Sequence, residues 1–258
     1  MKTAALRAVL YRTEMELVMM DKKSLTACTD ALWYKYRTGT IPVIPDIKCK
    51  SPGEGDLLSG RDPAEYAKML VAAGAPVVSV VTEAKHYGGS AEMFRRIARS
   101  VNVPLLRKDF ITSIEQLRES ADMGASGVLL IASKLGRQTL LQLTEASTVM
   151  GLEPLIETHS RDEITFAAGM KPTFLGINNR DICRYEVDNG NIGNTELLAS
   201  YAVPGALLLS ESSISSTNDI RRAAAAGAHA VLVGTAILRA RDPAVMYRTL
   251  SSVDAPGI

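Results

Sequence analysis

Two opposite charges end the first apolar run of this chain, spaced two residues apart. Asp46 and Lys48 close the run that begins at Pro42, and a loop rich in Ser, Pro and Gly follows them. Because residues two apart in a strand share a face, the two side chains point the same way at the strand end. Burying such charges in a core is costly. We therefore expect them at the mouth of a site, where an ammonium group and a carboxylate can give and take protons.

Polar side chains end most of the later apolar runs as well. At those ends the sequence has Glu83, Lys108, Glu157, Asn178, Glu211 and Thr235. If the runs are parallel strands around one axis, these groups share one opening, and an active site explains them better than a structural ring of charges. A lysine crowded by another lysine has its charged form disfavoured. We therefore expect a lowered pKa and easier proton release in the Lys48–Lys108 pair.

Small and hydroxyl-bearing residues end the last two runs and suit a phosphate group. Ser212-Ser213 and Gly234-Thr235 offer hydroxyl and backbone N–H groups. A helix starting after Gly234 would direct its positive end to the same place. Loops after the seventh and eighth strands are also the usual phosphate site of an eight-stranded α/β barrel. Ser51, in the loop after the first run, could close over the phosphate; ordinary tight turns are the alternative interpretation.

An alternation of strands and helices must position these groups. Nearly continuous apolar runs, typical of strands buried on both faces, occur at 42–48, 76–82, 103–108, 127–131, 153–157, 174–178, 206–210 and 230–234. Helical periodicity marks the segments 63–73, 90–100, 113–123 and 137–150. Eight such units predict an α/β fold of the (β/α)8 TIM barrel type rather than an open doubly wound sheet. The turns from helix to strand are expected at Gly74, Gly124 and Gly227.

The sequence divides into an N-terminal helical extension, residues 1–41, and a barrel domain, residues 42–258. The extension has helical patterns of Leu, Val and Met, and it contains the single tryptophan, Trp33, beside Tyr34 and Tyr36. It could cap the bottom of the barrel or cover the mouth of the site. The sequence favours neither alternative.

The composition excludes several classes of protein. The chain has 258 residues with 29 Lys+Arg against 28 Asp+Glu, a formal net charge of only +1, so no overall basic bias favours nucleic acid or an anionic membrane as a partner. No apolar run reaches the roughly 18–20 residues that span a bilayer, and the N-terminus lacks a signal-peptide pattern. Three cysteines and three histidines are dispersed without the spacing of a metal site. We expect no metal, and a cytoplasmic protein with reduced thiols.

Seven stretches of the sequence match a known family pattern. In chain order they are IKCKSP (47–52), SVVTEAKHYGGS (79–90), LLRKDF (105–110), PLIETHS (154–160), GINNRD (176–181), SESSIS (210–215) and VLVGTAIL (231–238). Over most of its length, from about Pro42 to Leu238, the chain resembles indole-3-glycerol phosphate synthases. LRKDF and GINNRD in this order, with Glu157 between them, make the resemblance specific.

The resemblance implies an enzyme that closes an indole ring. Members of the family convert 1-(2-carboxyphenylamino)-1-deoxyribulose 5-phosphate into indole-3-glycerol phosphate, with loss of CO2 and water, in tryptophan biosynthesis and without metal or cofactor. By resemblance, Lys108 is the general acid at the substrate ketone, and Glu157 is the carboxylate that assists dehydration and deprotonation. Lys48 lies near the substrate carboxylate, and Asn178 orients the substrate. Asp46 stands where the family has a glutamate.

The same resemblance implies a set of substrate-binding residues. Tyr87 falls where the family places an aromatic side chain against the substrate ring, and Glu211 lines the floor of the site. The expected anchors of the phosphate and the rest of the substrate are Ser51, Arg180, Ser212, Ser213, Gly234 and Thr235. We expect a small phosphorylated molecule as the partner, and a monomer or weak homodimer.

Three features depart from the family pattern. Asp46 replaces the usual glutamate and follows Pro45, which lacks a backbone N–H and is disfavoured in a central strand. Ser213 replaces a glycine that lets phosphate approach the backbone, so we expect strain there. The extension around Trp33 lacks the usual Lys/Glu-rich helix. Two alternatives therefore stay open: a divergent paralogue acting on a different arylamine-linked sugar phosphate, and a non-catalytic protein that binds a phosphorylated ligand.

Overall fold

Eight parallel strands close into a barrel. The computed structural model describes residues 27–52, 54–180 and 191–256. The barrel strands are β1 (Val43–Ile47), β4 (Val78–Val81), β5 (Leu105–Lys108), β6 (Gly127–Ile131), β7 (Glu153–Thr158), β8 (Phe174–Asn178), β9 (Leu207–Glu211) and β10 (Ala230–Val233). They are paired in parallel in chain order, and β10 closes the ring against β1. The predicted (β/α)8 TIM barrel is confirmed.

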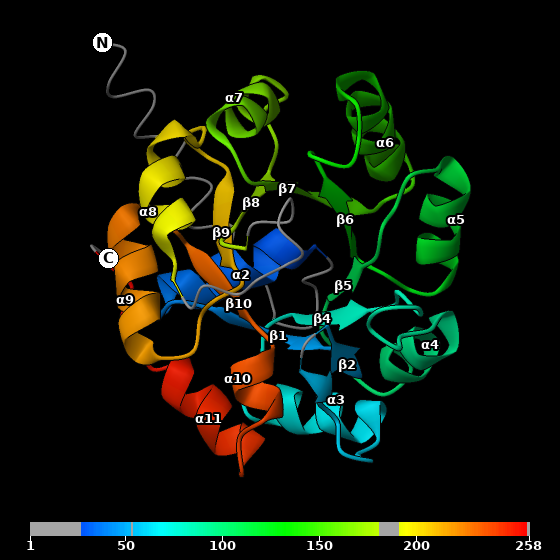
Figure 1. The fold of residues 1–258 in the computed structure, drawn as a ribbon, viewed down its shortest axis with the longest axis vertical. Helices are drawn as coiled ribbons and strands as arrows, with labels where there is room; N and C mark the ends of the chain where they lie inside the picture. Colours follow the sequence, from blue (N-terminus) through cyan, green and yellow to red (C-terminus); the bar gives the residue numbers. More distant parts are fainter. Residues whose placement is uncertain (1–26, 53, 181–190, 257–258) are drawn as a thin grey trace.

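Helices surround the ring of strands. They are α3 (Pro63–Ala72), α4 (Ala91–Ala98), α5 (Ile114–Asp122), α6 (Arg137–Val149), α7 (Arg161–Gly169), α8 (Gly193–Leu198) with the 3-10 turn η3 (Ala199–Tyr201), α9 (Thr217–Ala226), α10 (Thr235–Leu238) and α11 (Pro243–Leu250). Figure 1 looks into the barrel and shows this outer layer. Three of these helices end before Gly74, Gly124 and Gly227, whose φ angles are +110°, +86° and +111°. A backbone of this kind favours glycine, as the sequence predicts.

Alternation along each strand separates an outer core from an inner one. Val80 of β4 faces outward and packs in one cluster with Ile97 of α4. Leu207 and Leu209 of β9 belong to the inner core, and Glu211, two residues farther on, shares their face. Apolar side chains therefore fill the lower barrel, and polar ones follow at the carboxyl ends of the strands. The same order recurs at Ile44-Asp46, Leu106-Lys108 and Leu155-Glu157.

A helix from the N-terminal extension covers the lower end of the barrel. Cys28 and Leu32 of α2 (Cys28–Arg37) belong to the inner core. The Thr29 backbone N–H donates to the Glu153 side chain at the start of β7, over 2.9 Å. The Trp33 ring lies 4.7 Å from the ring of His229, just before β10. In Figure 1, α2 accordingly crosses the centre of the barrel.

Of the two alternatives for the extension, the bottom cap is confirmed for α2. The apolar positions predicted before Ala27 lie outside the described residues, and the division at residue 41 stays a prediction. Within the part of the chain that the structure describes, no helix is long and apolar enough to cross a membrane.

Pro45 is accommodated inside β1, contrary to the expectation for a central strand. The ladder to β10 runs through Val43, Ile44 and Pro45, and the ladder to β4 runs through Asp46 and Ile47. Pro45 therefore stands where β1 changes from one neighbour to the other. A missing backbone donor is tolerated most easily at such a point.

Candidate active site

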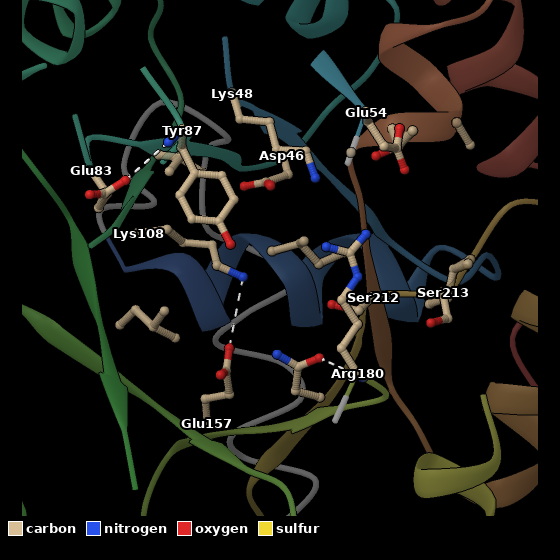
Figure 2. A pocket seen from close by; sticks show the side chains of 18 of the residues that line it. Asp46, Lys48, Glu54, Glu83, Tyr87, Lys108, Glu157, Arg180, Ser212 and Ser213 are labelled. Carbon is tan, nitrogen blue, oxygen red and sulfur yellow. Dashed lines mark hydrogen bonds and ion pairs between the residues drawn. The ribbon is translucent and has the colours of Figure 1, made fainter. Parts of the chain in front are cut away.

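A cavity of about 360 Å³ lies at the carboxyl ends of the barrel strands, opposite α2. All of the predicted site residues except Ser51 and Glu211 line it. Figure 2 shows their side chains converging from separate strands and loops. The expectation that the polar strand ends share one mouth is therefore confirmed.

Lys108 is the centre of the polar cluster. Its Nζ lies 2.7 Å from Oε2 of Glu211 and 3.9 Å from Oε2 of Glu157. The latter contact is drawn in Figure 2. Glu211 is fully buried beneath the cavity, where Gly176 of β8 makes room for it: a Cβ at that position would collide with Glu211 Oε1. Glu211 thus acts as the floor under Lys108, in contact with the lysine rather than with the cavity.

The two lysines differ in pKa, and the sequence-based expectation is right for only one. Burial lowers the pKa of Lys48, and the nearby Arg180 and Lys108 charges add to this, although Asp46 opposes it. Burial alone would also lower the pKa of Lys108. The carboxylates of Glu211, Asp46 and Glu157 outweigh burial and raise it instead. The prediction of a lowered pKa is wrong for Lys108, because carboxylates from three other strands converge on it.

The two buried glutamates shift in opposite directions. Burial raises the pKa of Glu211, and the neighbouring Glu157 charge adds to this rise more than Asp46 does. Burial alone would raise the pKa of Glu157 too. The contact with His159 and the charge of Lys108 lower it below the ordinary glutamate value. A pair of carboxyl groups with separated pKa values can hold and receive a proton at the same time.

Asp46 is held in place by a residue of the neighbouring strand. Its Oδ1 accepts a hydrogen bond of 2.7 Å from the Ser79 hydroxyl, and Asp46 is only 6% exposed. Gly234 lies on its other side, where an added Cβ would stand 3.4 Å from Asp46 Cβ and 3.3 Å from Lys48 Nζ. The site is therefore packed closely around the shorter carboxylate.

The loop after β9 has an unusual backbone. Ser212 and Ser213 have φ angles of +66° and +58°, a region that favours glycine. The strain expected at Ser213 is therefore present, and it extends to Ser212. Asn179 holds this loop: its Nδ2 donates to the carbonyls of Glu211 and Ser212 over 2.8 and 3.1 Å, and its Oδ1 accepts from Thr195 N.

Ser213→Gly is expected to raise the free energy of unfolding by about 1 kcal/mol, because glycine adopts a positive φ without steric cost. Urea denaturation measures the change. Ser59→Gly is the matched control, since Ser59 has a φ of +53° away from the cavity and should gain a similar amount. A loss of stability in Ser213→Gly alone would mean that the Ser213 side chain contributes more than its backbone costs.

The end of β10, the eighth barrel strand, adds a polar residue next to the Ser212-Ser213 loop. Thr235 lines the cavity, and its buried hydroxyl has no hydrogen-bond partner among the described residues. Asn178 and Arg180 approach from the end of β8, where Asn178 Oδ1 accepts from the Arg180 backbone N–H over 3.0 Å. Together with Ser212 and Ser213 they form a polar region of the cavity that contains one guanidinium group.

Another part of the cavity wall is apolar. Leu129 and Ile131 of β6 and Leu232 of β10 line it, together with Tyr87 and Phe110. Tyr87 is tied to Glu83, whose Oε2 accepts from the Tyr87 backbone N–H over 3.0 Å. This wall suits an aromatic ring. Leu129 and Ile131 are not among the residues predicted for the site, although their spacing of two at a strand end was a usable signal.

Ser51 does not reach the cavity. It lies in β2 (Lys50–Ser51), which pairs with β3 (Gly55–Asp56), and only 5% of it is exposed. Glu54, between these strands, lines the cavity instead. Arg239, just after α10, contacts Glu54 twice. Its Nε lies 3.1 Å from Glu54 Oε2, and its Nη2 donates to the Glu54 backbone carbonyl over 2.7 Å. No local pattern predicts this contact, because the two residues are 185 positions apart.

The described residues contain no group of three or more His, Cys, Asp and Glu side chains that could hold a metal ion. The polar groups that line the cavity are ammonium and guanidinium groups, carboxylates, the Asn178 amide and hydroxyl groups.

Comparisons with known proteins agree with this geometry. The family model of indole-3-glycerol phosphate synthase matches residues 3–250. The indole-3-glycerol phosphate synthase of Thermococcus kodakarensis is 40% identical over 212 residues, covering 82% of this chain and 92% of the relative. The Pyrococcus furiosus synthase is 39% identical over 208 residues, covering 80% and 90%. The Listeria monocytogenes serovar 1/2a synthase is 35% identical over 251 residues, covering 95% and 97%. The chain belongs to the indole-3-glycerol phosphate synthase family.

Proposed function

We propose that this protein converts 1-(2-carboxyphenylamino)-1-deoxyribulose 5-phosphate into indole-3-glycerol phosphate, with Lys108 and Glu157 as its central catalytic pair. The observation that carries the proposal is the Lys108 ammonium group at the cavity surface, 2.7 Å from Glu211 and 3.9 Å from Glu157. Such a group stabilises a carbonyl oxygen on which negative charge develops and can protonate it.

The chemistry assigns a step to each of these groups. The ring carbon that carries the carboxylate attacks the ketone carbon, and Lys108 gives a proton to the ketone oxygen as the new C–C bond forms. CO2 then leaves from that ring carbon. The hydroxyl group formed from the ketone oxygen takes a second proton, drawn from solvent, and leaves as water. Glu157 receives the carbon-bound proton whose loss completes the indole ring, and that proton then restores Lys108. The raised pKa of Lys108 keeps it protonated for the first step, and the lowered pKa of Glu157 keeps it ionised for the last.

The polar and apolar parts of the cavity suit the two ends of this substrate. The phosphate is assigned to Ser212, Ser213, Gly234 and Thr235, and the unpartnered Thr235 hydroxyl supports this. The aromatic ring is assigned to the wall formed by Tyr87, Leu129 and Ile131. The substrate carboxylate is assigned to Lys48 and Arg180, which both line the cavity, with Asn178 as the orienting amide.

The direct test is turnover. The full chain is incubated with the carboxyphenylamino-deoxyribulose phosphate, and the product is followed by indole fluorescence and by CO2 release. We expect steady turnover of this substrate. Tight binding without turnover at high enzyme concentration would contradict the proposal and favour a non-catalytic binder; the comparisons give no support to that alternative or to a paralogue with another substrate. The cytoplasmic location and the monomer or weak homodimer stay predictions.

Asp46→Glu is expected to lower kcat about 10- to 100-fold, because the added methylene moves the carboxylate by more than 1 Å and displaces Lys48 or Gly234. The 2.7 Å bond from Ser79 would be lost or bent as well. Steady-state kinetics with the natural substrate measure the effect. The double variant Asp46→Glu/Ser79→Ala, which makes room for the longer side chain, should recover part of the loss. A rise in kcat in the single variant would instead mean that Asp46 is too short for its role.

A further inference from the structure

The side chain of His159 lies between two carboxylates, those of Glu157 and Glu163. The His159 side chain is only 11% exposed and does not line the cavity. Its Nε2 lies 3.3 Å from Glu157 Oε1, an ion-pair distance without a well-aligned hydrogen bond. Its Nδ1 lies 3.4 Å from Oε2 of Glu163, in the first turn of α7. The imidazole ring thus bridges the strand end and the helix that follows it.

The two oxygens of Glu157 consequently have different neighbours. Oε1 is next to His159, whereas Oε2 is the oxygen nearest to Lys108, at 3.9 Å. A carboxylate held at one oxygen cannot rotate freely, so the other oxygen stays directed toward the reacting groups. Without His159, the Glu157 carboxylate could turn toward either side.

Glu163 is itself fixed by the backbone. Its Oε2 accepts from the His159 backbone N–H over 2.8 Å, and its own backbone N–H donates to the Ser160 hydroxyl over 3.3 Å. Ser160 is the N-cap residue of α7. The Glu163 carboxylate therefore both accepts from the backbone at the start of α7 and contacts the His159 ring. Because the helix start is fixed, the orientation of the ring is fixed as well.

We propose that His159, held by Glu163, is a positioning residue that fixes the rotation of the Glu157 carboxylate and keeps it ionised within the barrel. This inference rests on the proposed role of Glu157 in the ring closure. A fully buried carboxylate without such a partner prefers to be protonated, and a protonated carboxyl group cannot receive another proton. His159 supplies a positive charge on the side of Glu157 that the substrate does not occupy.

The charges around this pair agree with the assignment. Burial alone would lower the pKa of His159, but the contacts with Glu157 and Glu163 raise it to about 9, so the ring is charged at neutral pH. Among the influences that lower the pKa of Glu157, the close contact with the His159 ring is the largest, followed by the Lys108 charge from β5. Asn178 from β8 acts in the same direction, and the Glu157 charge in turn raises the pKa of Glu211 on β9.

His159→Leu and His159→Gln are the paired variants that test this role. In His159→Leu we expect kcat to fall about 10-fold with KM changed less than about 2-fold, and the acid limb of the kcat–pH profile to move up by about one unit. In His159→Gln the side-chain amide can donate a hydrogen bond to Glu157 Oε1 and hold that oxygen in place, so most of kcat should return. Because the amide is neutral, part of the shift of the acid limb should remain.

Two further variants separate position from charge. Glu163→Gln keeps an oxygen acceptor for the His159 backbone N–H and removes only the charge, so it should shift the acid limb in the same direction by less. His86→Leu is the matched control: His86 forms an exposed pair with Glu83 at 3.2 Å, and its side chain is 51% exposed. We expect its kcat and pH profile to match those of the unmodified protein.

A titration of Glu157 by NMR, with 13C-labelled glutamate in the full chain, tests the proposal without any turnover. We expect the pKa of Glu157 to rise by at least one unit in His159→Leu and to stay unchanged in His86→Leu. An unchanged Glu157 pKa, or equal kcat values in His159→Leu and His159→Gln, would overturn the proposal and leave His159 a structural residue. If the unmodified protein has no turnover, the proposed function fails while the titration still decides the role of His159.

Discussion

Replacement of Lys108 by alanine is expected to lower kcat about 1000-fold while KM changes little, because the lysine acts at the ketone oxygen where charge develops. In the structure its Nζ lies 2.7 Å from the Glu211 carboxylate and 3.9 Å from that of Glu157, both of them buried. Burial lowers the pKa of the neighbouring Lys48, whereas the carboxylates raise that of Lys108, so the two lysines are not equivalent. Single-turnover kinetics with the natural substrate, followed by indole fluorescence, measure the loss in the chemical step.

The same variant affects the fold, so the experiment needs two controls. Removing Lys108 leaves the fully buried Glu211 without its cation, and breaking a buried pair costs about 3–5 kcal/mol. Lys108→Ala/Glu211→Gln removes that unpaired charge and should recover stability but not kcat. Lys68→Ala, at an exposed lysine paired with Glu65, should change neither. Activity within 10-fold of normal in stable Lys108→Ala protein would refute the general-acid assignment.

The barrel and its polar mouth could be predicted from the sequence because both follow from local periodicity. The predicted runs 127–131 and 174–178 coincide with β6 and β8, and the others differ at their ends by only a few residues. A spacing of two residues places Asp46 and Lys48 on one face without any knowledge of the rest of the fold. The family motifs then identify the strand ends that carry function.

Features that depend on contacts between distant segments could not be predicted in this way. The raised pKa of Lys108 comes from carboxylates on β9, β1 and β7, which only barrel closure brings together. The absence of Ser51 from the cavity depends on the path of the loop after β1, and the Glu54–Arg239 pair joins that loop to the end of α10. Hydrophobic periodicity indicates the helix or strand in which a residue lies. It contains no information about which distant segments come into contact with that residue.

Glu157→Gln is expected to lower kcat at least 100-fold, because an amide cannot receive the proton that must leave to complete the ring. The replacement has nearly the same shape, and Glu157 is only 2% exposed, so the packing of β7 should persist. Substrate binding should persist too, since the phosphate and aromatic regions are formed by other residues. The expected signature is therefore a large fall in kcat with KM within a few-fold, measured by steady-state kinetics.

The pH dependence of stability gives an independent measure of the same carboxylate. The folded-state pKa of Glu157 lies below its ordinary value of 4.5, so its ionised form contributes stability above pH 4.5 that is lost as the pH falls through the lower folded value. Glu157→Gln has no such group, and its free energy of unfolding should fall less steeply on acidification below pH 4.5. Glu65→Gln, at an exposed carboxylate, should keep the normal slope. If the free energy of unfolding fell equally steeply with pH in Glu157→Gln and in the unmodified protein, Glu157 would not be held ionised in the barrel. That result would contradict its role as the group that receives the proton.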